Sequence, residues 1–189
     1  MNPLYQAGLE IQTFLQNRKW PFCFIGGIVV LRWGQVRMTQ DIDLSVFTGF
    51  GSERPFISAL LDAFPSRIPD AEKFALENRV LLLSAHNGVS VDLSLASIPF
   101  EAEMMQRASA FAYAKDCSLI TCSAEDLIIL KAFANRPQDW LDVESIFIRQ
   151  EHTLLDTDHI RKQLEPLCQA KSDLSILDRL TEIIERHAT

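Results

Sequence analysis

The sequence lacks the marks of several large protein classes. No stretch approaches the roughly 20 apolar residues that a membrane-spanning helix needs, and Met1 to Arg18 lack the apolar core of a signal peptide. There is also no P-loop, GxSxG or HExxH motif. We therefore expect a cytoplasmic protein without membrane contact, and none of the enzyme classes that those motifs mark.

Cysteine and positive charge are also scarce in this chain of 189 residues. The four cysteines have neither zinc-ligand nor CxxC spacing, so we expect reduced side chains that pack as small hydrophobic groups. The formal net charge is -7, which argues against a protein that coats nucleic acid. A local basic patch, or carboxylates that gather divalent cations, is still compatible with that charge.

The first part of the chain alternates between helix and strand patterns. Apolar residues at helical spacing predict a helix before Pro21, and Phe22 to Ile25 read as a short buried strand that ends at Gly26-Gly27. Further elements are predicted as a short helix at Ile28 to Trp33, a strand at Asp41 to Phe47, a helix at Arg54 to Phe64, a hairpin around Asn87-Gly88 and a strand near Ser118 to Thr121.

From Ser123 onward the pattern is helical. Helices are predicted at Ala124 to Ala134, Gln138 to Gln150, Asp158 to Cys168 and Leu174 to Arg186. We expect an α+β protein with an α/β core over residues 1–122 and an α-helical subdomain over residues 123–189 that packs on the core.

Three aspartates occupy the polar faces of predicted strands. Asp41 and Asp43 are two residues apart, so their carboxylates project from one side of the strand. If Asp92 lies in register on a neighbouring strand, three carboxylates converge, and such a cluster needs a cation. Carboxylate oxygens suit Mg²⁺ or Mn²⁺, and Mg²⁺ often shares its site with substrate phosphates.

The glycine pair lies where a phosphate could bind. Gly26 and Gly27 stand at a strand-to-helix junction, where backbone N–H groups approach an anion closely. A phosphate there, with cations at Asp41 and Asp43, describes a nucleoside triphosphate site. Each piece alone has an ordinary alternative, since Gly-Gly is commonly a turn and exposed aspartates are commonly solvated surface.

These segments in order resemble a known signature. Ile25-Gly26-Gly27, then thirteen residues, then Asp41-Ile42-Asp43-Leu44 resemble the DNA polymerase β-like nucleotidyltransferase superfamily, and Val91-Asp92-Leu93 resembles its third-acid strand. Within it, three segments resemble the AbiEii/AbiGii toxin type, and the match spans roughly Phe22 to Ile146. The three segments are Arg37 to Asp43, Ser123 to Lys131 and Arg136 to Val143.

The resemblance implies a small mixed sheet flanked by helices, followed by a C-terminal helical bundle. It implies that Asp41, Asp43 and Asp92 bind metal and act in catalysis, that Lys131 reaches the nucleotide phosphates, and that Asp139 is a further active-site residue. Arg37 and Thr39 join Gly26 and Gly27 as expected nucleotide-binding residues. Lys131 interrupts an apolar stretch, where a lysine needs an anionic partner or an exit to water.

The expected activity is transfer of a nucleoside monophosphate from an NTP to an acceptor hydroxyl. The toxin-type resemblance favours an RNA 3′ end, with tRNA as one candidate, and implies a cognate antitoxin as partner. A protein or a small molecule such as an antibiotic is the alternative acceptor. Two further alternatives are a non-catalytic member of the superfamily that binds nucleotide or a partner protein, and an unrelated α/β domain in which the three aspartates are ordinary surface residues.

Overall fold

The computed structural model describes residues 2–150 and 155–187, and these form two compact units. The first unit contains the described residues of Met1–Ile28 and Met38–Cys122, and the second contains those of Val29–Arg37 and Ser123–Thr189. The short segment Val29–Arg37 thus belongs with the C-terminal helices, although it lies between two parts of the first unit in the sequence.

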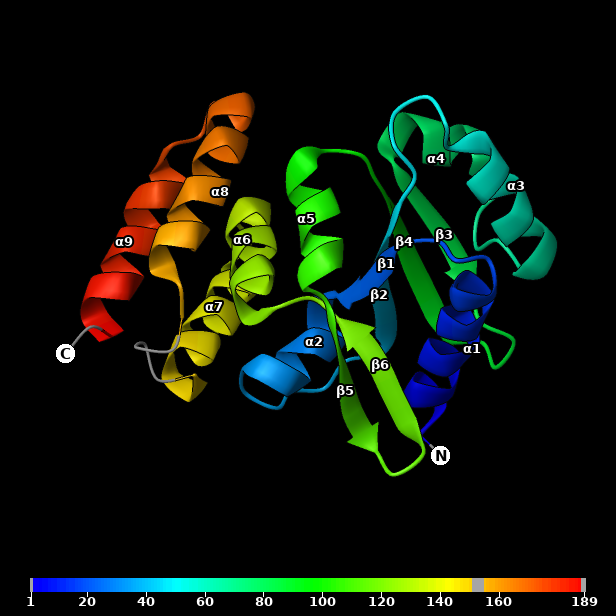
Figure 1. Ribbon diagram of the computed structural model, residues 1–189, viewed down its shortest axis with the longest axis horizontal. Helices are drawn as coiled ribbons and strands as arrows, with labels where there is room; N and C mark the ends of the chain where they lie inside the picture. Colours follow the sequence, from blue (N-terminus) through cyan, green and yellow to red (C-terminus); the bar gives the residue numbers. More distant parts are fainter. Residues whose placement is uncertain (1, 151–154, 188–189) are drawn as a thin grey trace. The chain divides into compact units, whose positions relative to one another are not determined.

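The first unit is built on a six-stranded mixed sheet (Figure 1). The strand order is β3-β4-β2-β1-β6-β5, and the neighbours are antiparallel except for the parallel pairs β2–β4 and β1–β6. The strands are β1 (Phe22–Ile25), β2 (Asp41–Phe47), β3 (Val80–Ser84), β4 (Ser90–Ala96), β5 (Ser109–Ala114) and β6 (Cys117–Thr121).

Helix α1 shows how the sequence covers this sheet. The Asn2 side chain accepts the Leu4 N–H and Pro3 occupies the first helical position, both of which favour a helix start. Gly8 lets the helix approach Leu119 of β6 closely, because a Cβ there would lie 3.0 Å from a Leu119 methyl carbon. The helices of this unit are α1 (Pro3–Asn17), the start of α2 (Gly26–Trp33), α3 (Arg54–Ala63), α4 (Ala71–Asn78) and α5 (Pro99–Arg107).

Strand β2 is central and its two sides differ. Ile42, Leu44 and Val46 are fully buried, whereas Asp41 is exposed and Asp43 is half-buried. The apolar side fixes the strand in the core, because slipping by one residue would bury the carboxylates and expose these side chains. The alternation therefore sets which side of the sheet carries the acids.

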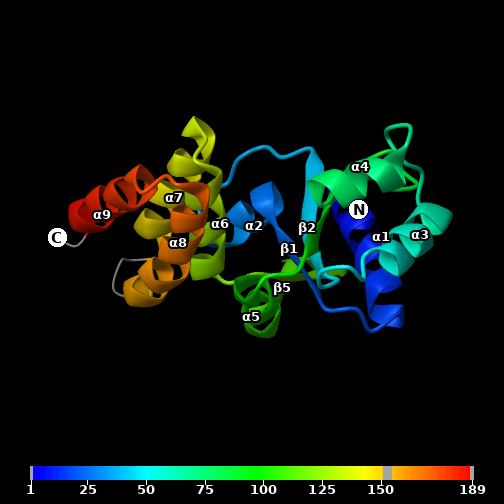
Figure 2. The ribbon, with the colours of Figure 1, turned by 90° about the horizontal axis from the view of Figure 1, so that it is seen from above.

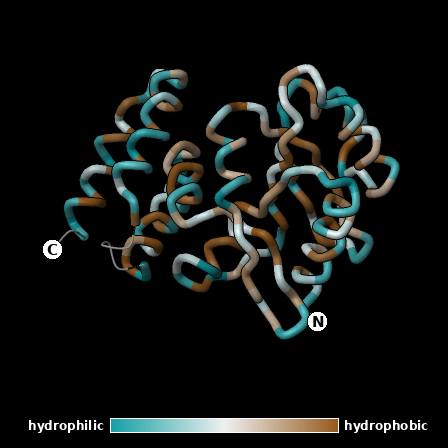
Figure 3. The backbone as a smooth tube through the Cα atoms, in the orientation of Figure 1, coloured by the Kyte–Doolittle hydropathy of each residue, from teal (hydrophilic) through white to brown (hydrophobic). Residues whose placement is uncertain are grey.

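The second unit is a helical bundle that also includes the end of α2. Its other helices are α6 (Ala124–Ala134), α7 (Pro137–Arg149), α8 (Thr157–Lys171) and α9 (Ser175–His187). Helix α6 contacts the other three and supplies the fully buried Leu127, Ile128 and Ile129. Figure 2 shows α6 beside α7 and α8. Along α9 hydrophobic and hydrophilic stretches alternate (Figure 3), as expected for a helix with one buried face.

The predicted α+β class, with a mixed sheet flanked by helices and a C-terminal bundle, is confirmed. Three elements were not predicted, namely α4, α5 and β5. Helix α4 buries only Ala71 and Ala75, so it has no apolar stripe, and β5 is a mostly exposed edge strand. All four cysteines are buried. No helix within the described residues is long and apolar enough to cross a membrane.

Candidate active site

The structure brings the three predicted aspartates to neighbouring strands. Asp43 of β2 and Asp92 of β4 are direct partners in a parallel pairing, and Asp41 pairs with Ser90. Because residues paired in this way point to the same face of a sheet, the three side chains share one face. The register that the sequence analysis required for Asp92 is therefore present.

Asp41 stands at the first position of β2 and is supported by the preceding connection. The Thr39 hydroxyl donates to Asp41 Oδ1 over 3.2 Å. Thr39 was expected to bind nucleotide, but in this structure its hydroxyl contacts an acid. The contact limits the rotation of the most exposed of the three carboxylates.

Asp92 is half-buried and has a guanidinium partner. Arg67, from the loop after α3, donates to Asp92 Oδ1. Burial raises the pKa of Asp92 above its ordinary value, the Arg67 charge opposes that rise, and the negative charge of Asp41 adds to it. The Asp41 contribution shows that two of the acids are close enough to repel each other, which is the condition that a bound cation relieves.

The glycine pair abuts the central aspartate. Gly26 has a φ of +67°, and a Cβ on it would come within 2.6 Å of the Asp43 Cβ, so only glycine fits without a shift. The Gly27 N–H points to Asp43 Oδ2 over 3.4 Å, a long hydrogen bond. Gly26 and Gly27, predicted to hold a phosphate, thus lie beside Asp43 at the start of α2.

The donor set suits a cation that is shared with a substrate. Within residues 2–150 and 155–187, no three histidine, cysteine or acidic side chains are arranged to hold a metal ion. Mg²⁺ is commonly bound by one or two carboxylates together with substrate phosphates and water. Paired carboxylates at Asp43 and Asp92, with Asp41 on the same face, fit that pattern better than a closed protein cage.

The second unit contains the predicted residues Lys131, Asp139 and Arg37 in a cluster where cationic side chains alternate with carboxylates. Lys131 of α6 is 7% exposed, and its Nζ lies 2.9 Å from Asp139 Oδ1 and 2.7 Å from Asp142 Oδ2. Asp139 also accepts the Arg136 Nε over 2.5 Å, and Asp142 accepts the Arg37 Nε over 2.8 Å. In these contacts three cations share two carboxylates.

The two carboxylates of this cluster are ionised by their partners. Burial alone would raise the pKa of Asp139, but hydrogen bonds from Arg136 and Lys131 outweigh it, and the pKa lies below its ordinary value. Arg37 and Lys131 likewise outweigh burial and lower the pKa of Asp142. The anionic partner that the sequence required for Lys131 therefore consists of two aspartates on α7.

Sequence reasoning missed Asp142, Arg136 and Arg67 as members of these clusters. Asp142 had a usable signal, since it lies one helical turn after Asp139 on the predicted helix and thus on the same face. Arg67 had none, because an arginine in a polar loop is ordinarily solvated.

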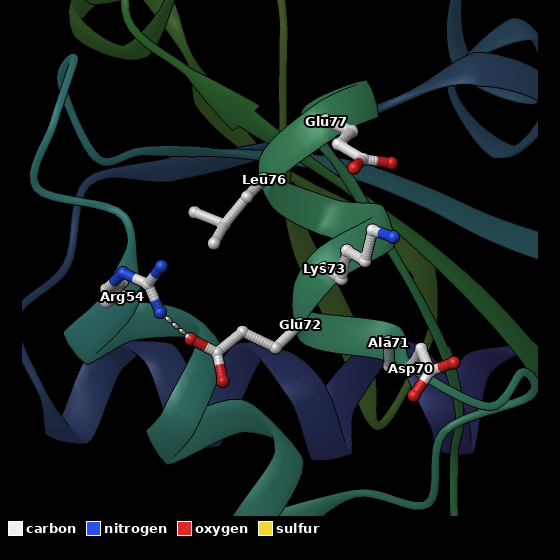
Figure 4. Close-up of a pocket in the computed structure, with 7 residues that line it drawn as sticks. All are labelled: Arg54, Asp70, Ala71, Glu72, Lys73, Leu76 and Glu77. Carbon is white, nitrogen blue, oxygen red and sulfur yellow. Dashed lines mark hydrogen bonds and ion pairs between the residues drawn. The ribbon is translucent and has the colours of Figure 1, made fainter.

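A separate pocket between α3 and α4 is lined mainly by charged residues, including the Arg54–Glu72 ion pair (Figure 4), and none of the predicted residues lines it.

Solved structures of known proteins share this fold. The antibiotic-resistance factor ANT(2'')-Ia superposes with a TM-score of 0.55 over 97% of this chain and 97% of its own, at 20% identity. This chain shares its fold with solved nucleotidyltransferase-like structures. A nucleotidyltransferase-like protein from Paracoccidioides brasiliensis gives a TM-score of 0.53 at 14% identity, covering 96% of this chain and 92% of its own.

A lincosamide antibiotic adenylyltransferase with bound lincomycin gives a TM-score of 0.51 at 15% identity, over 75% of this chain and 94% of its own. By contrast, no protein-family model and no curated protein sequence matches this chain. At these identities the likeness concerns the fold, and the function has to be argued from the residues.

Substituting Gly26 tests the contact with Asp43. Gly26→Ala and Gly49→Ala both place alanine at positive φ, +67° and +74°, which costs about 1–2 kcal/mol. An added Cβ at Gly49 meets nothing within 4 Å, whereas the Cβ at Gly26 is forced against Asp43. Urea unfolding should show Gly26→Ala to be less stable than Gly49→Ala by about 1–3 kcal/mol. Equal losses would contradict this close approach.

Removing the Lys131 charge tests the buried cluster. Lys131→Met leaves two buried carboxylates with one cation fewer, so the free energy of unfolding should fall by about 3–5 kcal/mol. The control is Arg54→Ala, which breaks an ion pair whose side chains are 71% and 50% exposed and should cost less than about 1 kcal/mol. Similar losses in the two variants would show that Lys131 is not held as described.

The lowered pKa of Asp139 predicts a pH-dependent mutational effect. A carboxyl whose pKa is lowered by folding stabilises the protein above its unfolded pKa of about 3.9, and that stability disappears as the pH falls through the folded value. Asp139→Asn, which mimics the protonated form, should therefore be clearly destabilising at pH 7 and progressively less so below about pH 4. Unfolding of both proteins across this range measures the difference, and a difference independent of pH would refute the assignment.

Proposed function

We propose that this chain is a metal-dependent nucleotidyltransferase, which transfers a nucleoside monophosphate from an NTP to an acceptor hydroxyl and releases pyrophosphate. The observation that carries the proposal is the direct pairing of Asp43 with Asp92, on the face that Asp41 shares and beside the Gly26-Gly27 helix start. The nucleotidyltransferase fold of the solved structures supports it.

The aspartates and the glycine pair of the first unit would have separate roles in this reaction. Asp41 and Asp43 would hold Mg²⁺ or Mn²⁺, with Asp92 as third ligand or base once its contact with Arg67 is released. When bound, the cation would neutralise phosphate charge and lower the pKa of the attacking hydroxyl. Gly26 and Gly27 would let a phosphate approach the start of α2 beside Asp43, once the long contact of the Gly27 N–H with Asp43 is released.

The charged cluster of the second unit supports a nucleotide-binding role for Arg37 and Lys131. Both cations are held in place by carboxylates rather than left to move in solvent. Asp139 would serve by orienting Lys131, which it contacts directly.

We propose an RNA 3′ hydroxyl as the first candidate acceptor, with tRNA foremost, because three segments resemble the AbiEii toxin type. Such a toxin would have a cognate antitoxin. A small molecule is the second candidate, since two of the solved structures of this fold are an antibiotic-resistance factor and a lincosamide adenylyltransferase. A protein hydroxyl and nucleotide binding without transfer are the remaining alternatives.

Label transfer tests the proposal. The protein is incubated with each α-labelled NTP and Mg²⁺, in the presence of total RNA, a protein lysate, or lincosamide and aminoglycoside antibiotics. We expect label in one pool, and a loss of at least about a thousandfold in Asp41→Ala/Asp43→Ala, since the variant removes the cation ligands. Gly49→Ala, which lies beyond the end of β2 and whose added Cβ meets nothing within 4 Å, serves as a folded control.

Each outcome has a distinct meaning. Label on RNA would support the toxin-type acceptor, and label on an antibiotic would support the small-molecule acceptor. Label that persists at the wild-type rate in the double variant would overturn the assignment of the two aspartates. The absence of label from every pool, with retained Mg²⁺-dependent nucleotide binding, would support the non-catalytic alternative.

A further inference from the structure

Helix α7 holds the segment that leads into β2. The Ser145 hydroxyl accepts the Gln35 N–H over 3.1 Å, and Arg149 Nη1 donates to the carbonyls of Leu31 and Gly34 over 3.1 and 2.6 Å. Gln150 donates to the Trp33 carbonyl over 2.8 Å. These four contacts fix the backbone of residues 31–35 to the C-terminal half of α7.

Asp142 of α7 also contacts this part of the chain, through an ion pair with Arg37 rather than a hydrogen bond to the backbone. Its two carboxylate oxygens accept hydrogen bonds from Arg37 Nε over 2.8 Å and Arg37 Nη2 over 2.9 Å. This bidentate, parallel geometry gives the strongest arginine–carboxylate pairs. The oxygen that accepts Nη2 also accepts Lys131 Nζ over 2.7 Å. The Asp142 side chain is only 3% exposed and that of Arg37 is 32% exposed, so water screens these contacts less than it screens those of a fully exposed ion pair.

One carboxylate therefore binds two cations from different parts of the chain. Arg37 lies four residues before Asp41, and Lys131 lies in the middle of α6. Without the negative charge between them, the two cations would repel each other. Lys131 would keep Asp139 as its partner, but Arg37 would lose its bidentate contact, so the loss would affect Arg37 more than Lys131.

We propose that Asp142 is a positioning residue, which sets Arg37 against Lys131 so that both cations are presented together to the phosphates of the nucleotide. This inference rests on the proposed nucleotidyltransferase function. Asp142 acts through Arg37 and does not itself touch the substrate. Its effect is therefore on nucleotide affinity, while the chemical step depends on the aspartates of the first unit.

The test compares Asp142→Asn, Arg37→Ala and the double variant, with Ser145→Ala as a matched control. Ser145→Ala removes another α7 contact to the same segment without changing charge. Asp142→Asn keeps the shape of the side chain but loses the charge-assisted contacts, so the KM for the NTP should rise at least about tenfold, with little change in kcat. Arg37→Ala should raise KM similarly, and the double variant no further. Ser145→Ala should leave KM within about twofold.

Failure of this inference can be told apart from failure of the proposed function. If wild-type protein transfers label and Asp142→Asn keeps the wild-type KM, or if the two substitutions multiply in the double variant, the positioning role is overturned and the activity stands. If wild-type protein transfers no label, the proposed activity fails. The role of Asp142 is then tested by titration with Mg²⁺–ATP, in which the Kd values of the variants, relative to wild type, should change by the same factors as predicted for KM. A wild-type protein that neither transfers nor binds nucleotide would overturn both.

Discussion

The parallel pairing of β2 with β4 is the constraint on which the candidate site depends. It places Asp43 directly beside Asp92 and keeps both on the face that Asp41 shares. The pairing is enforced by the buried side of β2, where Ile42, Leu44 and Val46 have no exposed surface. A shift of one residue would turn the acids into the core, so the position of the carboxylates follows from hydrophobic packing on the opposite face.

The two units handle concentrated charge in different ways. In the first, like charges meet on an accessible strand face, and burial together with Asp41 raises the pKa of Asp92 despite Arg67. In the second, buried Lys131, Asp139 and Asp142 are flanked by two more exposed arginines, and hydrogen bonds lower the pKa values of Asp139 and Asp142. Like charges therefore meet in the first unit, whereas opposite charges compensate one another in the second.

Much of the first unit's site could be predicted from sequence because its signals are local. Alternation along residues 41–47 gave the strand and its polar face, and Asn87-Gly88 gave the hairpin that returns Asp92 to the sheet. The register of β4 on β2 could only be stated as a condition, since pairing between segments some 50 residues apart depends on the whole sheet. The contact between Gly26 and Asp43 likewise depends on how β1 lies against β2.

The charged cluster was only partly predictable for a related reason. A lysine within the apolar stretch of α6 indicated the need for an anionic partner or an exit to water, but the partner was not identified from the sequence, and in the structure Lys131 contacts both Asp139 and Asp142. Arg37 was predicted to bind nucleotide, and its pairing with Asp142 arises because the segment Val29–Arg37 belongs with the helical unit.

The central claim is that Asp43 helps to hold a cation together with a nucleotide, and Mn²⁺ binding tests it most directly. Free Mn²⁺ can be followed by electron paramagnetic resonance in the presence and absence of a non-hydrolysable ATP analogue, for the wild-type protein and for Asp43→Asn. The account predicts that the analogue strengthens Mn²⁺ binding to the wild type, because phosphate oxygens complete the ligand set, and that Asp43→Asn loses this effect. Equal Mn²⁺ binding by the two proteins, or no response to the analogue, would contradict it.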